Sequence, residues 1–163
     1  MAEVKGAHGV GGGSTGSKLP KAGAGDAAKA AAEEAKRRRA EREARKKALQ
    51  AEINALKEEI AKLEEEIAQY ELMKKNISEA IEKLTSAKSD IEESRTQLDS
   101  AYYSGSATTT KTMIQEQETQ IDSIISKLNN IISRINKKIE EKERKIELLQ
   151  KKIDSLNSQL AAL

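Results

Sequence analysis

Apolar residues recur every seven positions over most of the chain, in two runs separated by a short interval rich in serine and threonine. One series of the first run has eight members: Leu49, Leu56, Leu63, Tyr70, Ile77, Leu84, Ile91 and Leu98. The second run repeats the spacing with Ile125, Ile132, Ile139, Ile146, Ile153 and Leu160. In both runs a second apolar series lies three or four residues away. Paired series with this period predict long helices that bury a narrow stripe against one another.

The interval between the runs is centred on Gly105, the only glycine after residue 25. The arms on either side, residues 49–103 and 107–163, each hold about 55 residues, or roughly 80 Å of helix. Equal arms about a Ser-Gly-Ser sequence favour an antiparallel hairpin over one continuous helix, which would have to place this glycine and four nearby threonines in its interior. We predict an all-α fold, a long antiparallel two-helix coiled-coil hairpin over residues 48–163 with its bend near residues 103–111.

Charged residues interrupt the second series, at Lys74, Lys88 and Arg95 in the first run and at Lys142 in the second. Polar residues in a coiled-coil seam commonly fix register and oligomeric state at some cost in stability. We assign Lys74 and Lys142 this structural role and no further function.

The apolar stripe of the second run widens between residues 121 and 135, because Ile124 and Ile131 join the two series. A two-stranded seam needs two positions per heptad, whereas a wider stripe suits a bundle of three or more helices. We therefore predict that the half nearest the bend binds a further helical protein, or a second copy of the chain in a four-helix bundle. The predicted partner-binding residues are Ile77, Ile81, Leu84, Ile91, Leu98, Ile121, Ile124, Ile125, Leu128, Ile131 and Ile132.

The first 47 residues differ from the rest in charge and composition. They carry 12 basic and 6 acidic side chains, a net charge of +6, whereas residues 48–163 carry 17 and 21, a net charge of −4. Residues 1–25 are rich in glycine and offer little apolar surface to bury, so we predict a disordered tail. Residues 26–47 contain strong helix formers but no apolar residue larger than alanine, which predicts a basic, alanine-rich helical extension.

A basic cluster lies in this extension, formed by Lys36, Arg37, Arg38, Arg39, Arg42, Arg45, Lys46 and Lys47. Such a cluster can attract the phosphates of nucleic acid or of an anionic membrane. Glu41 and Glu43 dilute it, however, and neither an aromatic residue nor a large apolar one accompanies it. We favour a solvated or steering role, with nucleic-acid or membrane-surface binding as the alternative.

Composition argues against catalytic, metal, cofactor and small-molecule sites. Cysteine, tryptophan and phenylalanine are absent, and His8 is the only histidine. The sequence around Gly16 resembles a phosphate-binding loop only superficially, because Lys18 is out of register and no strand precedes it. We also expect no transmembrane segment and no cleavable signal peptide, since no apolar run approaches about 20 residues.

The tripeptide Tyr103-Ser104-Gly105, between two amphipathic helices, resembles the W-x-G turn of the WXG superfamily, with tyrosine in place of tryptophan. The layout of residues 48–163 is similar to that of the short coiled-coil proteins encoded beside LXG-type toxins in Gram-positive bacteria. The resemblance implies a targeting partner that binds the helical N-terminal region of a toxin for type VII secretion. It implies a cytoplasmic protein, or one that is exported together with that partner without a cleavable signal peptide. Tyr102 and Tyr103 would then be docking anchors or part of an export signal.

A different export apparatus is the main alternative. The hairpin proteins of flagellar and type III systems likewise combine a basic first helix with a long antiparallel pair. The sequence is therefore also compatible with a structural coiled-coil stalk or with a chaperone of such a system.

Overall fold

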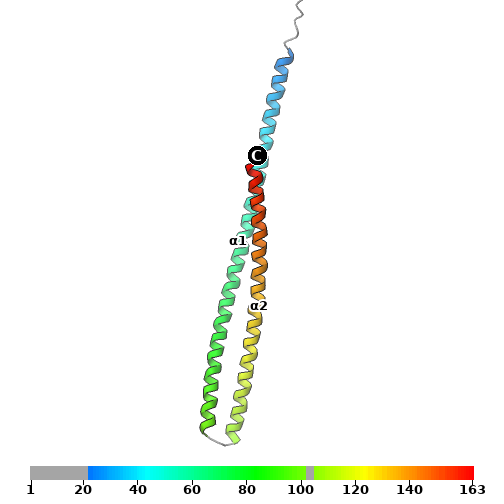
Figure 1. Ribbon diagram of the computed structural model, residues 1–163. Helices are drawn as coiled ribbons and strands as arrows, with labels where there is room; N and C mark the ends of the chain where they lie inside the picture. Colours follow the sequence, from blue (N-terminus) through cyan, green and yellow to red (C-terminus); the bar gives the residue numbers. More distant parts are fainter. Residues whose placement is uncertain (1–21, 102–104) are drawn as a thin grey trace, which may run out of the picture. The chain divides into compact units, whose positions relative to one another are not determined.

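The computed structural model of the chain describes residues 22–101 and 105–163, and it describes side chains for residues 23–99 and 108–163. These residues form two helices, α1 (Ala22–Ala101) and α2 (Gly105–Ala161), and no strand occurs among them (Figure 1). The predicted all-α class is confirmed. The chain divides into two compact units, Met1–Arg45 and Lys46–Leu163, and the second contains the hairpin.

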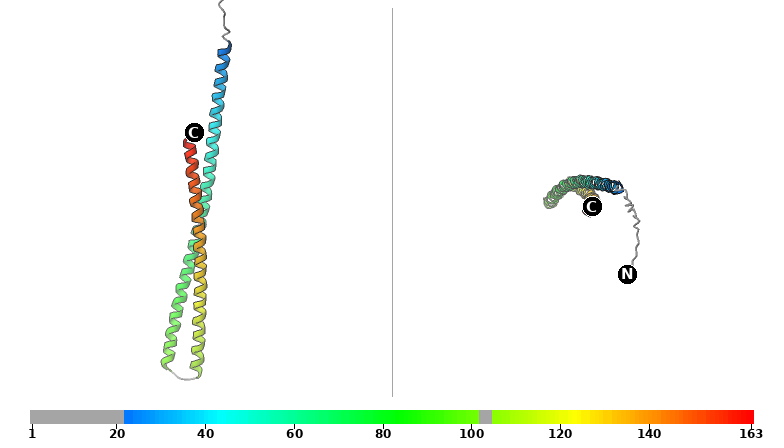
Figure 2. Two further views of the ribbon diagram at one scale, coloured as in Figure 1. Left: turned by 45° about the vertical axis from the view of Figure 1, so that its right-hand side comes forward. Right: turned by 90° about the horizontal axis from the view of Figure 1, so that it is seen from above.

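Ion pairs between the helices show that the hairpin is antiparallel. Glu52 pairs with Lys152 at 2.9 Å, far from the bend. Lys88 pairs with Asp122 at 2.7 Å, much nearer to it. As the residue number increases along α1, the number of its partner in α2 decreases, as it must in an antiparallel pair. The two helices lie side by side along the hairpin (Figure 1). In the turned view of Figure 2, α1 passes behind α2, as expected for helices that wrap around one another.

Both helices begin earlier than the sequence predicted. Residues 22–25 belong to α1 although we placed them in the tail; Ala22 and Ala24 favour the helix whereas Gly23 and Gly25 disfavour it, so the boundary depends on small differences in free energy. Residues 105–111 belong to α2 although we placed them in the bend. The hydroxyl of Thr112 donates to the carbonyl of Thr108 at 3.1 Å, so threonine is accommodated in this first part of the helix.

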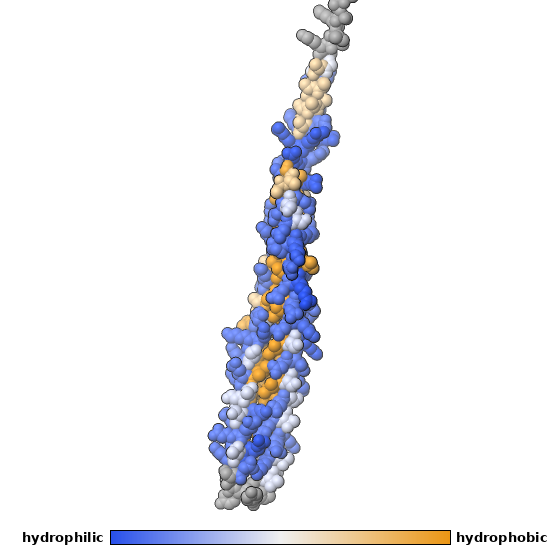
Figure 3. All heavy atoms as spheres, viewed as in Figure 1, coloured by the Kyte–Doolittle hydropathy of each residue, from blue (hydrophilic) through white to orange (hydrophobic). Residues whose placement is uncertain are grey.

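The buried side chains all belong to the predicted seam, and they lie in the part of the hairpin remote from the bend. They are Leu49, Ile53, Leu56, Ile60, Leu63, Ile135, Ile139, Ile153 and Leu156. Ile53 is the most enclosed, with 1% of its surface exposed. Burial of one such aliphatic side chain contributes about 1.5–3 kcal/mol, so this segment holds the two helices together. Figure 3 shows apolar residues in a line along the hairpin, flanked by hydrophilic ones.

The half of the hairpin nearest the bend has no comparable core. No described side chain between residues 64 and 134 is fully buried. Its seam includes an ion pair between Arg95 and Glu118 at 2.9 Å, and one oxygen of that glutamate is buried without a hydrogen-bond partner. Burying two charged groups costs desolvation free energy that can exceed the attraction between them, so a seam layer made of an ion pair packs less tightly than an apolar one. The bend half is therefore held less tightly than the remote half.

Candidate partner-binding face

Two rows of heptad positions border the seam on one side of the hairpin. Ion pairs from Glu52 to Lys152 at 2.9 Å and from Glu59 to Lys145 at 2.8 Å place these rows opposite each other. Because a coiled coil keeps residues seven apart on the same side, each row can be followed toward the bend. The row on α1 consists of Glu52, Glu59, Glu66, Met73, Ala80 and Ala87, and that on α2 of Lys152, Lys145, Lys138, Ile131, Ile124 and Gln117.

The chemistry of these rows changes midway along the hairpin. In the remote half they hold glutamates and lysines, which close the side of the seam with ion pairs. In the bend half the same positions hold Met73, Ala80, Ala87, Ile124 and Ile131, which we call the docking face, before the α2 row ends at Gln117. Three of these side chains are strongly exposed: Met73 by 50%, Ile124 by 44% and Ile131 by 41%. The ionic border is thus replaced by apolar surface open to solvent.

The opposite side of the bend half is polar. Lys88 donates a hydrogen bond to Asp122 and also lies 3.9 Å from Glu92, while Lys111 forms an ion pair with Asp99. The hydrogen bond that Lys88 donates to Asp122, assisted by the negative charges of Asp122, Glu92 and Glu118, raises the pKa of Lys88. The docking face thus lies on the side away from these ion pairs, while two further exposed apolar residues, Leu72 and Met113, lie outside it.

The structure separates the predicted partner-binding residues into two groups. Ile124 and Ile131 are exposed on the docking face. The other nine are half-buried in the seam between α1 and α2: Ile77, Ile81, Leu84, Ile91, Leu98, Ile121, Ile125, Leu128 and Ile132.

Sequence reasoning missed the contribution of α1 to the docking face. Met73, Ala80 and Ala87 lie seven residues apart and continue the row begun by Glu52 and Glu59. The usable signal was the change from glutamate to apolar residues along one heptad position. The alanines are small, so a partner helix could approach the backbone of α1 closely at these points.

A shallow depression marks the boundary between the ionic and apolar parts of these rows. It is lined by Glu66, Gln69, Tyr70 and Met73. Lys142 forms an ion pair with Glu66, and its ammonium lies 5.8 Å from the centre of the Tyr70 ring. The hydrogen bond to Glu66 raises the pKa of Lys142. Lys142, the charged residue that interrupts the apolar series of α2, therefore has its polar partners on α1.

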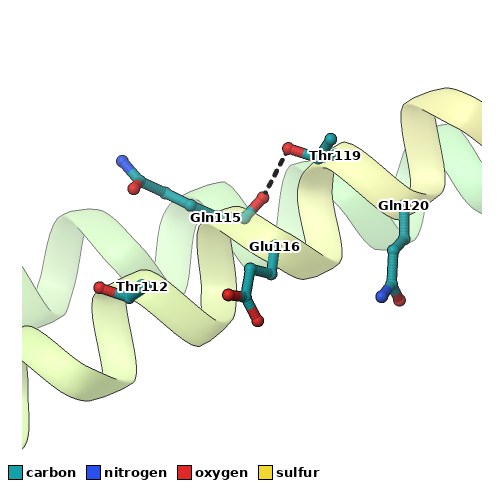
Figure 4. A pocket seen from close by; sticks show the side chains of 5 residues that line it. All are labelled: Thr112, Gln115, Glu116, Thr119 and Gln120. Atoms are coloured by element: carbon teal, nitrogen blue, oxygen red, sulfur yellow. Dashed lines mark hydrogen bonds between the residues drawn. The ribbon is translucent and has the colours of Figure 1, made fainter.

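A second depression lies on α2 near the bend, lined by Thr112, Gln115, Glu116, Thr119 and Gln120 (Figure 4). The Thr119 hydroxyl donates to the carbonyl of Gln115 at 2.9 Å, which is an intrahelical bond. All five residues belong to one helix surface, so the depression lacks the converging walls of a ligand site.

Six members of the basic cluster, from Lys36 to Arg45, lie on the α1 segment of the first unit, where every described side chain from residue 23 to 45 is exposed, while Lys46 and Lys47 begin the second unit. Part of its charge is neutralised within the helix. Arg37 pairs with Glu41 at 3.2 Å, and Arg38 pairs with Glu34. Such pairs, four residues apart, stabilise an isolated helix modestly, which supports the solvated role.

The last predicted site is the turn tripeptide Tyr103-Ser104-Gly105 with the preceding Tyr102. Tyr102 and Tyr103 lie outside the described residues, and Gly105 is the first residue of α2.

Over the described parts of the chain, neither helix offers an apolar stretch long enough to cross a bilayer. Comparison with protein-family models, curated proteins and solved structures finds no match for this chain.

Proposed function

We propose that the hairpin is a non-enzymatic protein-binding module whose docking face accepts a helix of a partner protein. One observation carries the proposal: the rows that pair glutamate with lysine in the remote half become exposed and apolar in the bend half. A hairpin that served only as a rod would gain stability from continued ion pairing at those positions. Apolar surface grouped on one side, by contrast, favours association with another apolar surface.

The resemblance to the coiled-coil partners of LXG-type toxins gives this module a biological role. We propose that it binds the helical N-terminal region of such a toxin in the cytoplasm and helps to target it to type VII secretion, with or without leaving the cell itself. Two helices of similar length in the second unit support this role, because they reproduce the layout on which the resemblance rests. A stalk or chaperone of another export apparatus remains the alternative, but a stalk alone gives no reason for the docking face.

The proposal can be tested by affinity capture of the tagged full-length chain from its native organism, followed by mass spectrometry. Introducing charge with Ile124→Asp and Ile131→Asp should abolish capture of the partner while circular dichroism shows unchanged helicity. Leu148→Asp is the matched control, because Leu148 is 66% exposed on α2 but lies outside the docking face. This control should capture the partner normally. Undiminished capture by the double variant, or its complete unfolding, would contradict the proposed role of the face.

A further inference from the structure

We infer that the segment bound at the docking face is an amphipathic helix whose apolar stripe is flanked by aspartate or glutamate. The inference rests on the proposed function and adds the chemical class of the partner. It comes from the charged residues that border the docking face on its outer edges.

Three cations border the docking face, each three residues after one of its members, and the same spacing places Asn76 after Met73 and Asp90 after Ala87. Lys83 follows Ala80, Lys127 follows Ile124, and Arg134 follows Ile131. Residues three apart on a helix are neighbours on its surface, so each cation lies beside the apolar residue that precedes it. We call these three residues the basic rim.

The basic rim has no ion-pair partner among the described residues, although glutamates and aspartates outnumber basic residues in the hairpin. All three side chains are exposed. On the same side of the hairpin, by contrast, Lys145 and Lys152 pair with glutamates of α1. A docked helix would thus meet the unpaired positive charges of Lys127 and Arg134 along the α2 edge, and Lys83 together with Asp90 along the α1 edge.

The docking face is long enough for a helix of moderate length. On α1 it extends from Met73 to Ala87, which corresponds to roughly 21 Å along the axis. A partner helix of about 15–20 residues, with apolar residues at heptad spacing, would cover it. Acidic residues on either side of that stripe would then lie within reach of the basic rim.

A second copy of the chain is a poorer occupant, because its rim carries the same charge. If two hairpins pack face to face and parallel about a two-fold axis, α1 of one lies over α2 of the other. Lys83 then faces Lys127. If they pack antiparallel, α2 lies over α2 and Lys127 approaches its own counterpart. Like charges opposed at an interface weaken association.

The inference can be tested with two synthetic peptides of about 28 residues, four heptads each. Both carry leucine at the two apolar positions of every heptad, and they differ only in having glutamate or lysine at the flanking positions. Binding of each fluorescently labelled peptide to the full-length protein is measured by anisotropy at low ionic strength. The glutamate peptide should bind about tenfold more tightly, as expected from three partly exposed ion pairs. The full-length protein carries a net charge of +2, with +6 in residues 1–47, so this preference is assigned to the rim only through the charge reversal that follows.

Charge reversal of the rim supplies the decisive comparison. The triple variant Lys83→Glu, Lys127→Glu and Arg134→Glu should reverse the order of the two peptides. A control with the same change in net charge, Lys62→Glu, Lys75→Glu and Lys137→Glu, should retain the original order because these exposed lysines lie outside the rim.

The possible failures are distinguishable. Equal binding of both peptides, or tighter binding of the lysine peptide, would overturn the acidic-partner inference. If Ile124→Asp abolishes the binding of both peptides in that case, the docking face itself is still supported. Binding of the glutamate peptide that survives both Ile124→Asp and Ile131→Asp would instead refute the docking face. Light scattering on the protein alone adds a third outcome. A dimer that Ile124→Asp dissociates would identify a second copy as the occupant and overturn the inference.

Discussion

Truncation of Ile53 tests whether the remote half of the hairpin holds the helices together. Ile53→Ala removes three carbon atoms from a side chain that is 1% exposed. At about 0.8 kcal/mol per buried methylene the transfer loss is about 2.4 kcal/mol, and the cavity left behind brings the total to about 3 kcal/mol. The same truncation of Ile124, which is 44% exposed, should cost about 1 kcal/mol or less, since solvent fills the space.

The two variants and the wild type are unfolded in urea as full-length proteins, and the loss of helix is monitored by far-ultraviolet circular dichroism. With a slope of about 2 kcal/mol per molar urea, Ile53→Ala should lower the midpoint by about 1.5 M and Ile124→Ala by about 0.5 M or less. Alanine is the better helix former in both variants, so its propensity cancels when the two are compared.

Equal shifts for the two variants would refute the reasoning, because they would mean that the bend half is as tightly packed as the remote half. A larger shift for Ile124→Ala would place the core near the bend. A change in slope without a change in midpoint would show that unfolding is not two-state, and the comparison would then need local probes in each half.

Three further predictions concern charged groups. Arg95→Leu should lower stability by about 2 kcal/mol in urea unfolding because it leaves Glu118 half-buried and unpaired, whereas adding Glu118→Leu should restore the loss. The raised pKa of Lys88 means that its contribution is present below its ordinary value of 10.5 and lost as pH rises through the raised value, so the urea midpoints of the wild type and Lys88→Met should converge at high pH. Any binding of DNA or anionic vesicles by the basic cluster should disappear by about 0.2 M salt, and retention in a sedimentation assay would reveal a dedicated site.

The seam could be predicted because it depends on local information. Seven-residue spacing of Leu and Ile identifies the buried stripe of each helix without knowledge of its partner, and every fully buried residue belongs to it. Equal arms about Gly105 then made the antiparallel arrangement the simplest pairing. Helix ends were less accurate, because a terminal turn is nearly neutral in free energy and its boundary shifts by a few residues.

The docking face could not be predicted in full because it depends on the register between the helices. Ile124 and Ile131 stand out in the sequence as additions to a stripe, but Met73 and Ala80 do not. Cross-helix pairs such as Glu59 with Lys145 align the two rows, and only then does α1 supply the other half of the face. The degree of burial also escaped prediction, because a heptad pattern does not reveal how tightly each layer packs.

The loosely packed part of the seam and the exposed docking face lie in the same half of the hairpin. The Arg95–Glu118 layer holds a carboxylate oxygen that is buried yet has no hydrogen-bond partner, so the seam there includes a cost that the remote half avoids. Half-buried seam residues such as Leu84 and Leu128 consequently retain contact with water. A helix docked beside them would remove that water as well as covering Ile124 and Ile131. Binding would therefore stabilise the hairpin where it is weakest, which couples partner recognition to the order of the bend half while the remote half keeps the two helices in register.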